Sequence, residues 1–252
     1  MADAGRAGTS LEIGAGAGVE IVAAGVEIDA AVLPVRDVNR EIRAALAGGA
    51  PVIVRNPGAR HSLGVALLAP GQVTFDGSVG YYCGGMGDGA TVHVTGSAGW
   101  GLAEGILSGT IVVDGNAGNS AAAAIRGGTV VVRGDCAARA GVSMKGGRLL
   151  VAGNAGYMTG FMMQKGYIAI AGDAGDALAD SMYEGTVYVA GEIASLGNDT
   201  VVEVASDTDQ AMLEAAFAEF NLPPPRHFRR IVAGRKLWNF EKHELETWRA
   251  AL

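Results

Sequence analysis

A pattern of alternating apolar and polar positions recurs every 19 residues between Val73 and about Ala194. Each unit contains a short apolar segment that leads into a glycine. The evenly spaced glycines are Gly77, Gly96, Gly115, Gly134, Gly153, Gly172 and Gly191. The apolar positions are four residues before each glycine (Val73, Val92, Ile111, Val130, Leu149, Ile168, Val187) and two residues before it (Phe75, Val94, Val113, Val132, Val151, Ile170, Val189). This alternation predicts a β-strand with one buried face in every unit.

The length of the repeat indicates the architecture. A strand with a full crossover helix needs about 30 residues, whereas 19 residues suit one coil of a parallel β-helix. We therefore predict an all-β chain, a right-handed parallel β-helix (solenoid) of about seven 19-residue coils with short α-helical caps at both ends. The anchor glycines would form a column along it, where they need either a positive φ or a close approach between coils.

Three further columns follow from stacking the coils. Asn and Asp, which tolerate left-handed turns, directly follow four of the anchors: Asn116, Asp135, Asn154 and Asp173. Large apolar residues ten positions after the anchors are expected to fill the interior: Ile106, Ile125, Met144, Met163 and Met182. The outward column three positions before the anchors is unusually apolar: His93, Val112, Val131, Leu150, Ala169 and Tyr188. Such a stripe is covered either by the chain's own ends or by another subunit.

The segments on either side lack the repeat. We divide the chain into a flexible N-terminal segment (1–25), an α/β N-terminal cap (26–72), the β-helix (73–205) and a C-terminal helix with a basic, aromatic tail (206–252). In the cap we expect strands at 26–29 and 51–55, and between them a helix at 34–47 with Asp37 as its N-cap. Helical spacing of apolar residues predicts a second helix at 206–220.

A partner interface is predicted from two surfaces of this arrangement. Aromatic residues and arginine are common anchors of protein interfaces, and the tail after the proline-rich stretch 222–225 is rich in both. The residues assigned to the interface are Val112, Val131 and Leu150 of the outward column, and Arg235, Trp238 and Phe240 of the tail.

Composition narrows the possible functions. The chain has 252 residues, 49% of them hydrophobic, without an apolar run of the length of a membrane helix or a signal peptide. Its net charge of -7 argues against a nucleic-acid partner. The charge is uneven, because residues 221–252 hold seven Lys or Arg against three Asp or Glu. We expect a cytoplasmic protein with no membrane contact.

The residues that could carry chemistry do not converge. The four histidines, His61, His93, His227 and His243, lack metal-ligand spacing. Cys83 and Cys136 have no evident catalytic partner and are expected to be buried. Asp173, Asp176 and Asp180 are interpreted as solvated turn residues. We therefore assign no catalytic, cofactor-binding or metal-binding residue to this chain.

Two glycine-rich stretches leave other interpretations open. The string Gly14–Gly18 looks like a dinucleotide loop, but no convincing strand precedes it and no helix pattern follows it. The stretch Tyr81–Gly89 contains repeated glycines and is either a binding loop or an irregular first coil.

The repeat resembles the GXGXG domain of glutamate synthases over about residues 73–191. Some stretches are similar to a narrower group, the stand-alone GXGXG subunits of N-methylglutamate synthases (methylamine–glutamate N-methyltransferases). These stretches are Gly80–Met86, Gly115–Gly118, Ser195–Gly197 and Gly234–Phe240. The resemblance implies a right-handed β-helix without catalytic residues of its own.

The resemblance also implies partners. An FMN-binding subunit, with or without an iron–sulfur cluster, and an amidotransferase-like subunit would convert methylamine and glutamate to N-methylglutamate and ammonia. This chain would carry no cofactor and would hold the two partners in register. The same repeat occurs in the C subunits of formylmethanofuran dehydrogenases and of formyltransferase/hydrolase complexes, which is the alternative assignment. A free-standing structural β-helix is the third.

Overall fold

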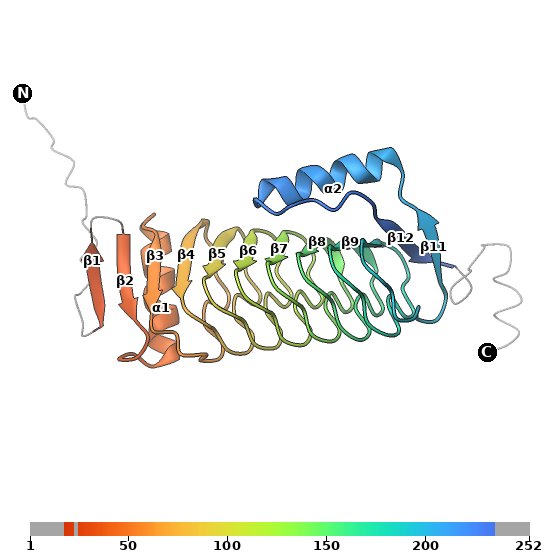
Figure 1. Ribbon diagram of the computed structural model, residues 1–252. Helices are drawn as coiled ribbons and strands as arrows, with labels where there is room; N and C mark the ends of the chain where they lie inside the picture. Colours follow the sequence, from red (N-terminus) through yellow and green to blue (C-terminus); the bar gives the residue numbers. More distant parts are fainter. Residues whose placement is uncertain (1–17, 23–24, 235–252) are drawn as a thin grey trace, which may run out of the picture.

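The computed structural model of the chain, in which residues 18–22 and 25–234 are described, is a solenoid with one sheet along its side (Figure 1). The strands are β1 (Val19–Val22), β2 (Gly25–Asp29), β3 (Val52–Arg55), β4 (Gly71–Asp76), β5 (Ala90–Val94), β6 (Thr110–Val113), β7 (Thr129–Val132), β8 (Lys145–Val151), β9 (Lys165–Ile170), β10 (Thr186–Val189), β11 (Thr200–Val204) and β12 (Arg229–Ala233). The helices are α1 (Val35–Ala47) and α2 (Asp207–Glu219). The predicted all-β solenoid with two short helices is confirmed.

The repeat sets the register of the sheet. From β2 to β10 each strand pairs in parallel with the next strand of the chain. Val92 lies opposite Ile111, which lies opposite Val130, so neighbouring strands are offset by one 19-residue unit. The sheet is antiparallel only at its two ends, where β1 pairs with β2 and β12 lies between β10 and β11.

The position of β12 was not expected. Residues 229–233 fall in the segment interpreted as a basic tail, yet they form an interior strand of the sheet. The reason is that Ile231 faces the core and is fully buried, while Arg229 and Arg230 use their charged ends to bind Glu192 and Glu203 at the rim. Part of the predicted tail therefore belongs to the solenoid itself.

The interior is formed by the columns that the alternation predicted. Every residue two or four positions before an anchor is at most 3% exposed, which confirms the inward face of each strand. The large apolar column ten positions after the anchors is equally buried, from Ile106 to Met182. Close packing of this kind leaves the solenoid filled along its length.

The anchor positions require glycine because neighbouring coils come close there, and not because the backbone turns with a positive φ. Apart from Gly77, none of them has a positive φ. Their restriction is close approach between coils: a Cβ on Gly134 would overlap the Oδ1 of Asn116 and lie 2.9 Å from the carbonyl oxygen of Gly115. The expectation of a tight contact between coils is thus confirmed, and that of a left-handed turn at this column is wrong.

Positive φ values occur instead at three regular positions after each of the first six anchors, Gly77 to Gly172. They lie five, seven and nine residues after the anchor, for example at Ser120, Ala122 and Ala124. Tyr82, Gly84 and Met86 occupy the same three positions of the coil that follows Gly77. The glycine-rich stretch Tyr81–Gly89 is therefore a regular coil in its backbone, not an irregular one.

The Asn and Asp residues after the anchors form a ladder of hydrogen bonds. The backbone N–H of Asp135 donates to Oδ1 of Asn116 (2.9 Å), that of Asn154 donates to Oδ1 of Asp135 (2.7 Å), and that of Asp173 donates to Oδ1 of Asn154 (2.8 Å). None of the four has a positive φ, so the left-handed turn expected for them is also wrong. They join consecutive coils along the corner of the solenoid.

The helices cover two different surfaces. α1 begins after Pro34, and Asp37 lies inside its first turn, where it pairs with Arg40 instead of capping the helix. α2 begins at a capping box formed by Ser206 and Asp209. It lies along the row of strands, outside the sheet, instead of across the end of the solenoid (Figure 1). Neither helix, in the part of the chain described, has the length and apolar character that a membrane span requires.

Candidate partner interfaces

The outer face of the sheet is divided into a covered half and an open half. Over β7–β10 the outward column of Val131, Leu150, Ala169 and Tyr188 is buried beneath Leu213, Ala216 and Phe217 of α2, together with Leu222 and Phe228. Val131 and Leu150 were assigned to a partner interface, and this assignment is corrected: the chain itself covers them. Val112, at the edge of the cluster, is only partly buried.

Polar contacts hold α2 in this position at both of its ends. The Tyr188 hydroxyl donates to Oδ1 of Asp209 at the start of the helix (2.5 Å), and Arg148 pairs with Glu219 at its end (2.6 Å). Arg133 donates to the carbonyl oxygen of Phe220 (3.0 Å). Burial raises the pKa of Tyr188 to about 12, and the bond to Asp209 adds to this effect. Burial opposes ionisation of Asp209, but the hydrogen bonds from Tyr188 and Ser206 lower its pKa overall.

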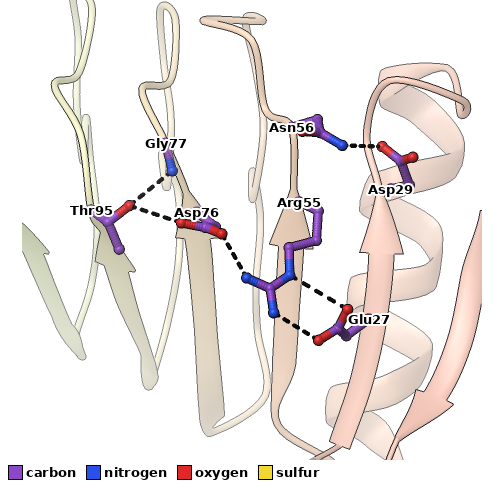
Figure 2. A network of polar contacts seen from close by, with 7 residues as sticks. All are labelled: Glu27, Asp29, Arg55, Asn56, Asp76, Gly77 and Thr95. Carbon is purple, nitrogen blue, oxygen red and sulfur yellow. Dashed lines mark hydrogen bonds and ion pairs between the residues drawn. The ribbon is translucent and has the colours of Figure 1, made fainter.

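The open half of the outer face, over β2–β6, carries a polar network (Figure 2). Arg55 lies between two carboxylates: its Nη2 is 2.8 Å from Glu27 and its Nη1 is 2.6 Å from Asp76. The amide of Asn56 donates to Asp29 (3.0 Å). The hydrogen bond from Arg55 lowers the pKa of Glu27, and the bonds to Glu27 and Asp76 raise the pKa of Arg55. The network fixes these side chains in an ordered, charged row.

A hollow of about 490 Å³ borders this network, next to Gly18, Glu20, Glu27, Asp29 and Arg55. Its lining holds three carboxylates and one guanidinium, and that guanidinium is already shared by two carboxylates. An acid-rich lining of this kind repels phosphate. The hollow therefore gives no support to the dinucleotide interpretation of the glycine-rich stretch that ends at Gly18.

A second polar group connects the open half to the covered half. Asp114 binds His93 through Oδ2 (2.9 Å) and Arg133 through Oδ1 (3.0 Å). Because Arg133 also contacts the end of α2, the charged surface continues up to the helix. The open half therefore extends along the sheet from β2 to the edge of α2.

An exposed aromatic column lies at a corner of the first coils. The rings of His61, Tyr81 and Trp100 are stacked, with centroids 4.3 Å and 5.2 Å apart. Tyr81 is 39% exposed and Trp100 is 52% exposed. A Cβ on Gly118 would come within 2.6 Å of Trp100, so the next coil has room for the ring only because of this glycine.

The stacking determines what this column can bind. Both faces of the Tyr81 ring are covered by its neighbours, so this ring presents its edge to solvent. A sugar or a base needs an open ring face for stacking, whereas a protein surface can pack against edges. Tyr82 and Met86, which belong to the same coil as Tyr81, are both more than half exposed and add apolar surface to that coil. We name this surface the aromatic column, comprising His61, Tyr81, Tyr82, Met86 and Trp100.

The sequence analysis did not identify the aromatic column as a unit, although the signal was present. Trp100 lies four residues after an anchor glycine, as does Tyr81 in the preceding coil. Aligning the coils on their anchors places the two rings one above the other. Tyr157 occupies the same position in a later coil and is also half exposed. It is separated from this column by two coils that carry Asn119 and Ala138 at this position.

The residues considered for chemistry lie apart from one another. Cys83 and Cys136 are buried, as expected, and burial raises the pKa of each thiol to about 12. Asp173 and Asp176 are exposed at the corners, but Asp180 is only 8% exposed and accepts hydrogen bonds from Asn198, which corrects its interpretation as a solvated turn residue. Among the described residues no three His, Cys, Asp or Glu side chains are grouped to hold a metal.

Three predicted interface residues, Arg235, Trp238 and Phe240, lie outside the described residues, as does His243. The structure therefore tests only the outward column of the predicted interface. The surfaces left uncovered by the described residues include the open half of the sheet and the aromatic column.

Comparison with known proteins finds similarity both to a curated protein and to solved structures, while no protein-family model matches the chain. The chain is 45% identical over 84 residues to Protein GlxC from Rhizobium meliloti (strain 1021), a match that spans 32% of this chain and only 37% of that protein. Among solved structures, it is similar to a chain of the formyltransferase/hydrolase complex FhcABCD from Methylorubrum extorquens, crystallised with methylofuran. That similarity has a TM-score of 0.62 and 28% identity, and covers 68% of this chain and 67% of the other. In fold and in sequence, this chain is thus similar to a component of a multi-subunit complex.

Proposed function

We propose that this chain is a non-catalytic scaffold subunit of a hetero-oligomeric enzyme. The observation that carries the proposal is the combination of a filled interior with an exposed, rigidly stacked aromatic column. The interior of the solenoid, as far as it is described, is filled with apolar side chains and leaves no room for a substrate, whereas aromatic side chains fixed at an exposed corner are suited to anchor a partner. The similarity to a chain of the FhcABCD complex supports a role within an assembly.

For the identity of the enzyme we propose a glutamate synthase-like complex of the N-methylglutamate synthase type. The GXGXG repeat and the stretches Gly80–Met86 and Gly234–Phe240, which resemble that group, support this assignment. An amidotransferase-like subunit would handle the amine, and an FMN subunit would carry out the redox chemistry on the imino acid. The chain would hold these two subunits in register and would contribute no cofactor of its own.

The second candidate is a role equivalent to that of the related chain in a formyltransferase/hydrolase complex. It is favoured by the structural similarity, which extends over two thirds of both chains. The two candidates share the scaffold role and differ in the partner subunits.

Co-expression distinguishes the candidates. The chain is produced with an N-terminal tag, alone and together with the products of its neighbouring genes. For the first candidate we expect co-purification with an amidotransferase-like and an FMN subunit, and formation of N-methylglutamate from methylamine and glutamate only when all three are present. Co-purification with a formyltransferase would support the second candidate. Amine transfer by the chain alone would contradict the scaffold role in both.

The aromatic column provides a sharper test of the scaffold role. Trp100→Ala removes an exposed ring of the column, and Tyr157→Ala removes an equally exposed ring outside it. We expect Trp100→Ala to weaken assembly by about tenfold or more and Tyr157→Ala to leave it unchanged, with the circular dichroism of both variants as in the wild type. Equal assembly of the two variants would show that the column is not the contact surface.

A further inference from the structure

The two ends of the solenoid are covered to different degrees. At the N-terminal end α1 packs on the inner face of the first strands, where Val26 and Ile28 of β2 are buried with Ile42 and Leu46 of the helix. At the C-terminal end the last strand of the sheet is β11, and Val202 and Val204 are 46% and 92% exposed. No described residue covers β11 in the way that α1 covers β2.

The register shows that these valines continue the core. Val187, Ile231 and Val202 lie opposite one another across β10, β12 and β11, so their side chains point to the same face of the sheet. Val187 and Ile231 are fully buried, whereas Val202 is exposed. Val204 lies opposite Arg229 and so belongs to the same inner face. The inner surface therefore extends one strand beyond the coils that fill it.

A second interior column of side chains also ends in an exposed residue at this end of the solenoid. Leu178 is fully buried and forms a bridge with Leu196 of the last coil, which is 39% exposed. Leu196, Val202 and Val204 thus form an apolar end surface, which we name the C-terminal end surface. Solenoids require a terminal cap for solubility, because an open apolar end associates with other chains.

We propose that residues 235–252 of the chain cover the C-terminal end surface. The segment starts at its rim: Gly234 donates its N–H to the carbonyl oxygen of Asp199, directly before β11 (2.7 Å). Its apolar residues recur at helical spacing, as in α1. They are Leu237, Phe240, Leu245, Trp248 and Leu252. A segment of 18 residues is long enough to reach across the end of the solenoid.

The sequence predicted that Trp238 and Phe240 contact a partner subunit, whereas here the segment that contains them covers the end of its own solenoid. This covering role does not depend on the proposed function, since a cap is needed whether or not the solenoid joins a complex. Its consequence for assembly is that the tail closes the chain's own core and leaves the contact with partners to the open half of the sheet and the aromatic column.

Thiol labelling tests the proposal, because both native cysteines are buried. Val204→Cys is introduced into the full chain and into a chain that stops at Gly234, and its reaction with a chromogenic disulfide is followed. We expect labelling at least about tenfold slower in the full chain. Leu68→Cys is the control, since Leu68 is 69% exposed at the other end of the solenoid and should react equally in both chains.

A point substitution in the full chain controls for misfolding of the shortened chain. Trp248→Asp in the full chain with Val204→Cys should speed labelling to the rate of the shortened chain. Equal labelling of Val204→Cys in all three proteins would overturn the proposal. So would protection that arises only at high protein concentration, which indicates a second copy, or only in the presence of partner subunits.

Discussion

Replacing Gly134 by alanine tests the account of the anchor column. The added Cβ would overlap Oδ1 of Asn116, which accepts the N–H of Asp135, and would lie 2.9 Å and 3.0 Å from the carbonyl oxygen and carbon of Gly115. The amide of Asn116 can rotate away, at the cost of its hydrogen bond. The backbone of Gly115 cannot move without shifting a whole coil.

The lost hydrogen bond and the overlap with the backbone together set the expected loss of stability. Loss of one hydrogen bond of the ladder costs about 1 kcal/mol, and the overlap with the backbone costs about 2 kcal/mol by analogy with overpacked cores. A total of about 3 kcal/mol corresponds to a fall of roughly 6–12 °C in the thermal midpoint for a chain of this size. Thermal unfolding, monitored by circular dichroism, measures this fall in the midpoint.

A double-mutant cycle separates the two effects. Asn116→Ala alone should cost about 1 kcal/mol, and combined with Gly134→Ala it should add almost nothing, because the same hydrogen bond is lost once. Gly85→Ala serves as a control: this glycine also lacks a positive φ, but its Cβ would be no closer than 3.4 Å to any atom. An unchanged midpoint for Gly134→Ala, or full additivity in the cycle, would refute the reasoning.

Three further predictions concern the core and the helix contact. Val132→Asp should abolish the cooperative thermal transition, since an unpaired charge at a fully buried position costs several kcal/mol; a normal melting curve would contradict the inward face of β7. Because the pKa of Tyr188 is raised to about 12, its stabilising contribution should be constant below about pH 10 and be lost as the pH rises towards 12. Denaturant unfolding of Tyr188→Phe against the wild type should therefore show a difference that shrinks above pH 10. Cys83 and Cys136 should react with a thiol reagent only at the rate of unfolding, because both thiols are buried and their pKa is about 12; rapid labelling of the native chain would show an open path to one of them.

The sequence predicted the parallel part of the sheet well, because each strand repeats the alternation and the constant interval sets the register. The interior columns, including Met144 and Met163, follow from the same spacing. The interval also indicated that the anchors need glycine, but not why. Close approach to Asn116 and a positive φ both exclude a side chain, and only coordinates distinguish them.

Elements outside the repeat were less predictable, because their partners are distant in the sequence. Residues 229–233 have a basic sequence, and only the pairing with β10 and β11 makes them a strand. The apolar outward column was recognised as a contact surface, yet its pattern is the same whether α2 or another subunit covers it. The aromatic column consists of single residues in separate coils, so it becomes visible only after the coils are stacked.

The position of α2 restricts how the length of this protein can change in evolution. Each inserted unit of 19 residues would lengthen the solenoid by about 4.8 Å, the spacing of paired strands, without altering the coils on either side. An insertion between β8 and β10 would separate Arg148 from Tyr188, which hold the two ends of α2, although the helix itself would keep its length. Between β4 and β6 nothing of the kind spans the strands, as far as the described residues extend (Figure 1). We expect homologues of different length to gain or lose whole coils in that half, where the number of coils sets the length of the open half.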